Sequence, residues 1–147
     1  MVKLALPAFC FVLISVIALS WQALANEDVM KIKISIEGGD VLTATMEDNS
    51  AARDFVSLLP ITLEMNDFAG TEKAAGSLPK NLSTEDAPQG HKPEAGDLAH
   101  YAPWNNLAAF YKADKYAGGL VLLGRIDGDP SALDIAYSIT VTIEQLN

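Results

Sequence analysis

Cysteine is almost missing from this chain of 147 residues, and the only one lies near the N-terminus. Cys10 stands inside an apolar run, and no cysteine follows it. The rest of the chain therefore cannot form a disulfide, even in a compartment that would allow one. Residues 7–9 do not form the Leu-small-small pattern that precedes a lipid-modified cysteine. A hydrophobic core must hold the protein together.

Basic residues are also scarce. The chain has 10 lysines and arginines against 19 aspartates and glutamates, which gives a formal net charge of −9. Such a surface repels phosphate groups, so nucleic acid and anionic membrane surfaces are poor partners. The simplest role of this acidity is solubility.

Residue patterns that usually carry catalysis or bind metals are absent. The two histidines, His91 and His100, have no second ligand at the spacing of a zinc site. No Gly-x-Ser-x-Gly nucleophile motif occurs. The glycine pairs at 38–39 and 118–119 do not stand in phosphate-binding loops. We therefore expect no metal, no cofactor and no recognisable catalytic set.

The first 25 residues have the pattern of a signal peptide. Lys3 gives a positive start, residues 4–19 are apolar, and Ala23-Leu24-Ala25 supplies a cleavage site. The alternative is a retained anchor, but a run of roughly 16 apolar residues is shorter than the ~20 that span a bilayer. We expect a secreted or periplasmic protein of one domain, residues 26–147, with no stable membrane insertion after cleavage.

Alternating side chains predict a strand at each end of this domain. Residues 30–36 place Met30 and three isoleucines on one face, and Gly38-Gly39 supplies a tight turn into a second strand over 41–47. Residues 137–144 alternate branched apolar side chains with serine and threonine. We therefore expect an N-terminal hairpin and a C-terminal strand.

A helix and further strands are predicted between these ends. Asn49 and its neighbours are typical N-cap residues, so a helix is expected over 50–59, ended by Pro60. Glycine and proline are frequent from 66 to 96, which indicates a long loop with at most a short strand near residues 73–78. The remaining expected elements are strands at 61–65, 97–101, 107–112 and 120–126 and one helical turn at 131–133.

Short strands with one helix favour a mostly β domain. Closure into an antiparallel barrel would remove the exposed strand edges that promote aggregation. An open sandwich stays possible, because periodicity reports the burial of a face and not the partner strand.

One stretch resembles a known family. Residues 96–112, GDLAHYAPWNNLAAFYK, resemble the signature of the bacterial cyclophilin-like domain family, and Leu122–Ile126 is similar to its late-strand motif. Residues 49–63, with Gly70–Lys73 and Leu78-Pro79, extend the likeness from about residue 31 to 144. The resemblance implies a closed eight-stranded cyclophilin-like antiparallel barrel with one or two short helices, one of them near an open end.

True cyclophilins are peptidyl-prolyl isomerases, but this chain departs from their catalytic pattern. The resemblance implies an arginine near a phenylalanine-rich Gln-Gly motif, whereas residues 64–70 read EMNDFAG. The only arginines are Arg53 and Arg125. Isomerase activity therefore cannot be transferred residue by residue.

The candidate ligand-binding residues are mostly aromatic or polar and gather in two segments. Aromatic side chains near Pro103 are candidates for a recognition wall, and the favoured alternative is ordinary barrel core with a turn at residues 103–106. Glu72, beside Lys73, and Arg125 are a possible ligand-orienting pair or a structural salt bridge. Asp97 is expected to cap a turn. The candidates are Tyr101, Pro103, Trp104, Asn106, Tyr111, Glu72 and Arg125.

Three functions remain open. The leading hypothesis is an exported binding module that holds a peptide or small molecule at one open end of the barrel. The alternative is a prolyl isomerase acting on exported proteins. A third possibility is a subunit of an assembly, and the sequence leaves the oligomeric state open.

Overall fold

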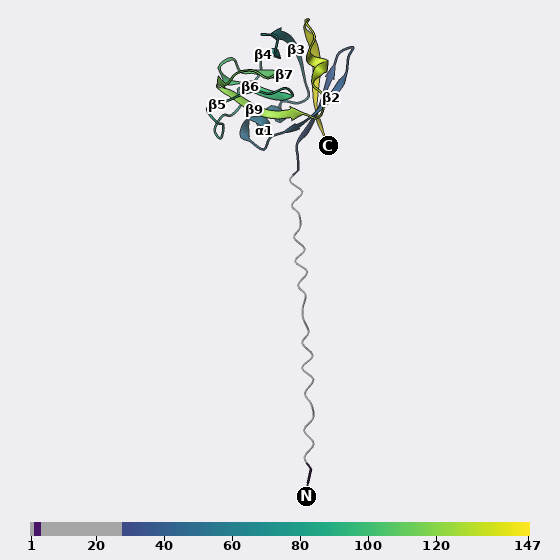
Figure 1. The fold of residues 1–147 in the computed structure, drawn as a ribbon, viewed down its shortest axis with the longest axis vertical. Coiled ribbons are helices and arrows are strands. Elements are labelled where there is room, and N and C mark those ends of the chain that lie inside the picture. The colour runs from purple at the N-terminus through teal and green to yellow at the C-terminus, as the bar shows by residue number, and fades with distance from the viewer. Residues whose placement is uncertain (1, 4–27) are drawn as a thin grey trace.

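The computed structural model describes residues 2–3 and 28–147, and the described chain forms a closed barrel of eight antiparallel strands (Figure 1). Around the barrel the strands follow the order β1-β10-β3-β4-β7-β6-β9-β2. The predicted fold class is confirmed. The strands are β1 (Lys31–Ile36), β2 (Val41–Met46), β3 (Ile61–Phe68), β4 (Glu72–Ser77), β5 (Gly90–His91), β6 (Asp97–Tyr101), β7 (Asn106–Phe110), β8 (Ala117–Gly118), β9 (Leu120–Ile126) and β10 (Ile139–Leu146).

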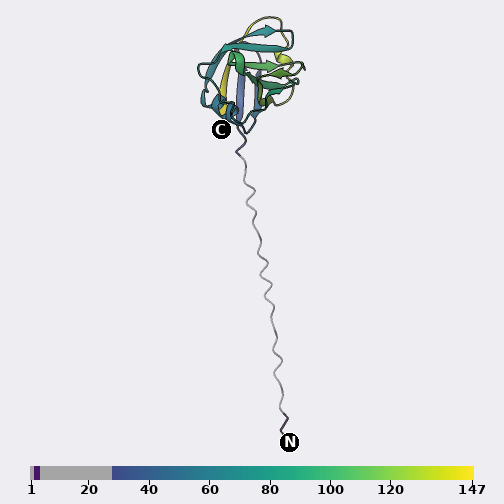
Figure 2. The ribbon, with the colours of Figure 1, turned by 90° about the vertical axis from the view of Figure 1, so that its left-hand side faces the viewer.

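The barrel closes where the two ends of the domain meet. Strand β1 pairs with β2 on one side and with β10 on the other, and Figure 2 shows the yellow β10 beside the dark blue β1. Ile32, Ile34 and Ile36 are buried in the main core, as their alternation predicts. The leader prediction falls on residues 1–25, which lie outside the described residues except for Val2 and Lys3.

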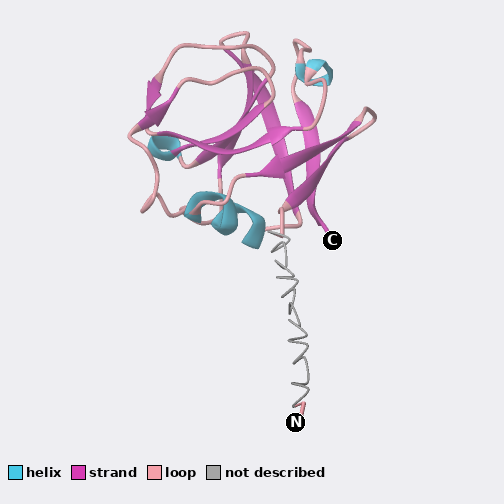
Figure 3. Cartoon of the chain, turned by 60° about the horizontal axis from the view of Figure 1, so that its bottom comes forward, coloured by secondary structure: helices cyan, strands magenta, loops and turns pink. Residues whose placement is uncertain are grey.

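Helix α1 (Ser50–Ser57) lies at one end of the barrel (Figure 3). The Asn49 side chain accepts a hydrogen bond from the Ala52 backbone N–H, so the predicted N-cap is confirmed. Phe55 is fully buried in the main core. The helix ends earlier than expected, because Leu58 takes the C-cap position two residues before Pro60.

The long loop predicted for residues 66–96 is shorter than expected at its start. Strand β3 continues to Phe68, and β4 pairs with both β3 and β7. The short strand expected near residues 73–78 is confirmed as β4. Its Ala-Ala-Gly content has a weak strand propensity, which pairing on both sides outweighs. Strands β5 and β8 form a separate two-stranded sheet that the sequence did not predict.

Strand β7 is buried on both of its faces. Leu107 and Ala109 belong to the main core inside the barrel, whereas Ala108 and Phe110 belong to a second apolar cluster. Alternation along the strand places this second cluster on the outer face of the barrel wall. Ala99 and Leu120 complete it from the neighbouring strands β6 and β9. The outer face is thus covered by other parts of the chain.

Lys73 is completely buried beneath the opposite end of the barrel. Its ammonium donates to Asp67 at 3.2 Å, to the Tyr137 carbonyl at 2.9 Å and to the Ile135 carbonyl. A buried lysine is tolerated only when its charge and donors are satisfied, and here all three protons have acceptors. The segment that leads into β10 is therefore held against β3 and β4, on the core side of the wall.

Asp97 is a fully buried carboxylate that joins three segments. It accepts hydrogen bonds from His91 Nε2 at 2.7 Å, from the Glu94 backbone N–H at 2.9 Å and from Arg125 Nε at 2.9 Å. Burial alone would raise the pKa of Asp97, but these donors outweigh it and hold that pKa below its ordinary value. The expected turn cap is present, and the same carboxylate also fixes β5 and β9.

We expect Asp97→Asn to destabilise the fold at pH 7 by roughly 2 kcal/mol, because the substitution removes a buried charge that Arg125 and His91 contact. Since the folded-state pKa of Asp97 is lowered, its stabilisation is present above pH ~4 and is lost as the pH falls through the folded pKa. Urea unfolding across this range should show that the free energies of unfolding of the parent chain and of Asp97→Asn converge in acid. Asp40→Asn, at an exposed turn, is the matched control. Parallel curves of unfolding free energy against pH for the parent chain and Asp97→Asn would contradict this role of Asp97.

Candidate functional site

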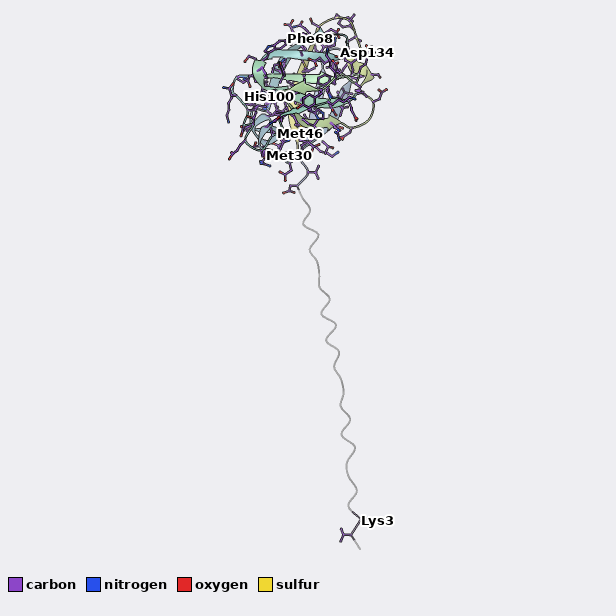
Figure 4. All side chains as sticks on the ribbon, turned by 60° about the vertical axis from the view of Figure 1, so that its left-hand side comes forward. Lys3, Met30, Met46, Phe68, His100 and Asp134 are labelled. Atoms are coloured by element: carbon purple, nitrogen blue, oxygen red, sulfur yellow. The ribbon has the colours of Figure 1, made fainter. Side chains whose placement is uncertain are left out.

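A pocket of about 230 Å³ lies on the outer face of the barrel wall. Its floor comes from β7 and β9, and its sides come from the end of β3, the residues after β6 and the segment before β8. Figure 4 places Phe68, one of its residues, far from Met30 and Met46 at the N-terminal side. The lining residues are Phe68, Glu72, Pro93, Tyr101, Trp104, Asn106, Ala108, Phe110, Asp114, Lys115, Tyr116, Ala117 and Leu120.

Three aromatic rings form the rim of this pocket. The Trp104 ring meets Phe68 edge-on at a centroid distance of 5.8 Å and Tyr101 at 5.2 Å. Trp104 remains 56% exposed and Phe68 46% exposed. Large apolar side chains left in water next to a hollow are typical of a surface that is covered when a partner binds.

A short and rigid turn presents Trp104. The 3₁₀ turn Ala102–Trp104 contains Pro103 and ends at Asn105, which adopts a left-handed conformation with φ of 47°. The Asn105 side chain donates to the carbonyls of Leu78 and Lys80, each at 3.2 Å. Because Pro103 restricts the turn and the Asn105 hydrogen bonds hold its end, the backbone at Trp104 has a defined position beside the pocket.

The pocket floor contains an unpaired acceptor. Asn106 is 4% exposed, and its Nδ2 donates to the Ala75 carbonyl at 3.0 Å. That carbonyl lies within the register shift between Ala74 and Ser77 in the β4–β7 ladder, where regular pairing is interrupted. The Asn106 Oδ1 atom is buried and has no hydrogen-bond partner. A buried amide oxygen without a donor is costly, so this atom is a candidate ligand contact.

The acidic side of the pocket is formed by Glu72 and Asp114. Burial, with a smaller contribution from the nearby charge of Asp114, raises the pKa of Glu72 to about 7. Asp114 differs, because hydrogen bonds from the Lys115 backbone N–H and the Thr71 hydroxyl lower its pKa. At neutral pH the pocket therefore holds one ionised carboxylate and one that is half protonated.

The predicted candidates separate into two groups. Tyr101, Trp104, Asn106 and Glu72 line the pocket together. Pro103 does not line the pocket and instead packs against Gly119. A Cβ atom on Gly119 would lie 2.9 Å from the Pro103 Cδ, which leaves no room for a side chain at that position.

Tyr111 and Arg125 lie elsewhere. Tyr111 belongs to the main core and donates from its hydroxyl to Asp67 at 2.6 Å; burial and this carboxylate raise its pKa to about 12. Arg125 pairs with Asp97 rather than with Glu72, so the proposed pair with Glu72 is wrong. Together with Arg53, Arg125 lines a separate groove near residues 28–30.

Several residues of the pocket escaped prediction. Phe68 falls in the segment 66–96 that is predicted as a loop, Asp114 falls between two predicted strands, and Phe110 falls within the strand predicted over 107–112 without being singled out. The signal was present in the run Asn106–Phe110, since a strand with apolar residues on both faces requires a cover outside the barrel. The sequence-based hypothesis places the ligand at an open end of the barrel, whereas this pocket lies on the outer wall.

No cluster of three or more metal-ligating side chains occurs in the described part of the chain. Within those same residues no helix is long and apolar enough to cross a membrane. What the arrangement offers chemically is an apolar surface with acceptor oxygens at its base, and no guanidinium group lines it.

Comparison with known proteins places the chain. Among curated proteins, none matches this sequence. A family profile described as the Cyclophilin-like family matches residues 34–144, which covers the barrel from the middle of β1 to β10. This chain therefore belongs to the Cyclophilin-like family.

Proposed function

We propose that this protein is an exported binding module that holds a peptide or a small molecule in the pocket on the outer wall of the barrel. The observation that carries the proposal is the combination of an exposed Trp104 rim with the unpaired, buried Asn106 Oδ1 in one hollow. A ligand that covered the rings and donated to this oxygen would remove both unfavourable features at once.

The pocket supports binding better than catalysis. A prolyl isomerase needs a donor placed at the twisting amide, and in the resemblance that donor is an arginine. The two arginines of this chain lie in a different groove, where Arg125 is held by Asp97 and Arg53 by Asp48. The net charge of −9 also supports a partner that is neither nucleic acid nor an anionic membrane.

The pocket is tested by titrating the protein with acetyl-Ala-Ala-Pro-Phe-amide and following the Trp104 indole N–H by NMR. We expect shifts at the pocket residues and at least a ten-fold loss of affinity in Trp104→Ala, measured by calorimetry, because rim aromatics often contribute more than 1 kcal/mol. The control is Tyr137→Ala, an aromatic side chain that is 69% exposed and does not line the pocket. Equal affinity in both variants would remove Trp104 from the site.

The same sample separates the two functions. Exchange spectroscopy reports the cis and trans forms of the peptide bond before proline, whose uncatalysed interconversion takes on the order of 10–100 s. Binding with exchange at the background rate supports the module. Exchange well above background would instead establish the isomerase and would mean that this pocket works without an arginine.

Export has its own test. We propose that residues 1–25 direct the chain out of the cytoplasm and are then removed, on the basis of the positive start, apolar run and small-residue site. Expressed in a Gram-negative bacterium, the chain should be recovered from the periplasmic fraction with Asn26 as its first residue, as read by intact mass. A cytoplasmic or membrane-retained chain with an intact N-terminus would contradict this.

A further inference from the structure

The pocket on the outer wall contains three side chains that present acceptor oxygens: Glu72, Asn106 and Asp114. Asn106 lines the pocket and donates an amide proton to the Ala75 carbonyl, and its Oδ1 is a buried acceptor without a partner. Glu72 and Asp114 add carboxylates. A ligand that fits these groups must bring hydrogen-bond donors, whereas a carboxylate or a phosphate would meet like charge.

Glu72 has no partner of its own among the described residues. Its carboxylate makes none of the hydrogen bonds or ion pairs found there, although Asp114, its acidic neighbour, accepts two hydrogen bonds. The residues paired with Glu72 across the strands are Phe68 on β3 and Phe110 on β7, and both are apolar. Burial and repulsion from Asp114 therefore act on Glu72 without local compensation.

The other titratable groups around the pocket do not supply that compensation. Tyr101 and Tyr116 contribute neutral phenols, from β6 and from the segment before β8. Lys115 is the single cation on the lining, but it is exposed and forms no ion pair in the described chain. Its backbone N–H, and not its ammonium, contacts Asp114. Lys115 therefore adds a positive charge to the pocket lining, and this charge opposes the binding of a cation.

The aromatic rim favours the same kind of ligand. The Trp104 ring lies nearly perpendicular to the Phe68 and Tyr101 rings, at 89° and 86°, so in each contact one ring presents its edge and its own faces stay free of the other ring. Ring faces attract ammonium and guanidinium groups, most strongly when water is partly excluded. Resting on the proposed function, we propose that this pocket selects a cationic ligand, a primary ammonium or guanidinium group carried on an apolar body, with Glu72, Asp114 and Asn106 Oδ1 as its acceptors.

Cation binding must then be linked to the protonation of Glu72. With a pKa of about 7 in the free protein, this carboxyl is mostly neutral at pH 6 and mostly ionised at pH 8. A cation favours the ionised form, so it binds better as the pH rises and releases a proton where Glu72 was neutral. The affinity for a cation should increase up to about ten-fold between pH 6 and pH 8, whereas the affinity for a neutral ligand should stay constant.

The test compares benzylammonium with benzyl alcohol, which have the same ring and nearly the same size but differ in charge. Trp21 and Trp104 are the only tryptophans, and Trp21 lies in the leader that we propose is removed, so the exported chain reports the pocket through Trp104 fluorescence. A chain that keeps its leader carries Trp21→Phe for the same purpose. We expect benzylammonium to bind at least ten-fold more tightly than benzyl alcohol at pH 8, with the rise between pH 6 and 8 described above. Calorimetry in buffers of different ionisation enthalpy should detect the released proton near pH 6.

Two variants give opposite results if the inference is correct. Glu72→Gln keeps the shape of the side chain and should weaken benzylammonium about five-fold or more and abolish its pH dependence, without affecting benzyl alcohol. Lys115→Gln alters an exposed side chain and should strengthen benzylammonium about two-fold, more at low salt. If Glu72→Gln does not fold, Lys115→Gln and the charged–neutral comparison still decide the matter.

Each failure has its own meaning. Equal affinity for benzylammonium and benzyl alcohol, or a pH-independent affinity in the parent chain, overturns the selection of cations while the pocket remains a binding site. If neither compound nor the proline peptide perturbs Trp104, both the cation selectivity and the proposed function are overturned.

Discussion

Closure of the barrel restricts where this protein can meet a ligand. A closed sheet has no free edge, so an extended partner cannot add a strand to it, and only the ends and the outer wall remain. Phe55 of α1 is buried in the core at one end, and the segment held by Lys73 covers the other. The outer wall of β6, β7 and β9 carries the apolar pocket, and a separate groove lined by Arg53 and Arg125 lies near residues 28–30.

Small side chains make the hollow on that wall. Ala99 and Ala108 lie on adjacent strands and are directly paired in the β6–β7 ladder, so the wall is thin between the larger Phe110 and Leu120. The connections around β5 and β8 then rise over this thin region and supply Pro93, Tyr116 and Ala117. Since the chain has no disulfide there, it relies on Asp97, whose contacts to His91 and Glu94 fix the loop that carries Pro93. One buried carboxylate thus connects the stability of the barrel to the shape of the pocket.

The sequence predicted those parts of the fold that depend on local pattern. The β1–β2 hairpin, the Asn49 cap and the strand β9 follow from alternation, turn glycines and capping chemistry. Strand β4 was predicted only as a short strand near residues 73–78 inside a long loop, because its alanines and Gly76 form a strand through pairing with β3 and β7. The partner of Arg125 could not be predicted, since Asp97 and Arg125 are brought together by the register of β6 against β9. Four candidate residues line one pocket because they lie on or beside the outer face of the barrel wall: Glu72, Tyr101, Trp104 and Asn106. Tyr111 instead lies in the main core, on the same side as Leu107 and Ala109.

The energetic costs of this structure are concentrated at and around the pocket. Of the buried side-chain atoms in the described residues, two lack a hydrogen bond: Asn106 Oδ1 in the pocket floor and Nδ1 of His100, whose other ring nitrogen contacts Asn105 in the turn that presents Trp104. Glu72 adds a carboxyl whose charge is opposed by burial. Elsewhere even difficult groups such as Lys73 and Asp97 are fully paired. A sequence that satisfies its core but leaves an unpaired acceptor, an uncompensated carboxyl and an exposed tryptophan ring at one pocket is locally inconsistent there, and such places are where natural proteins carry function. The missing contacts are donors and a cover for the rings, which together describe a cation on an apolar body.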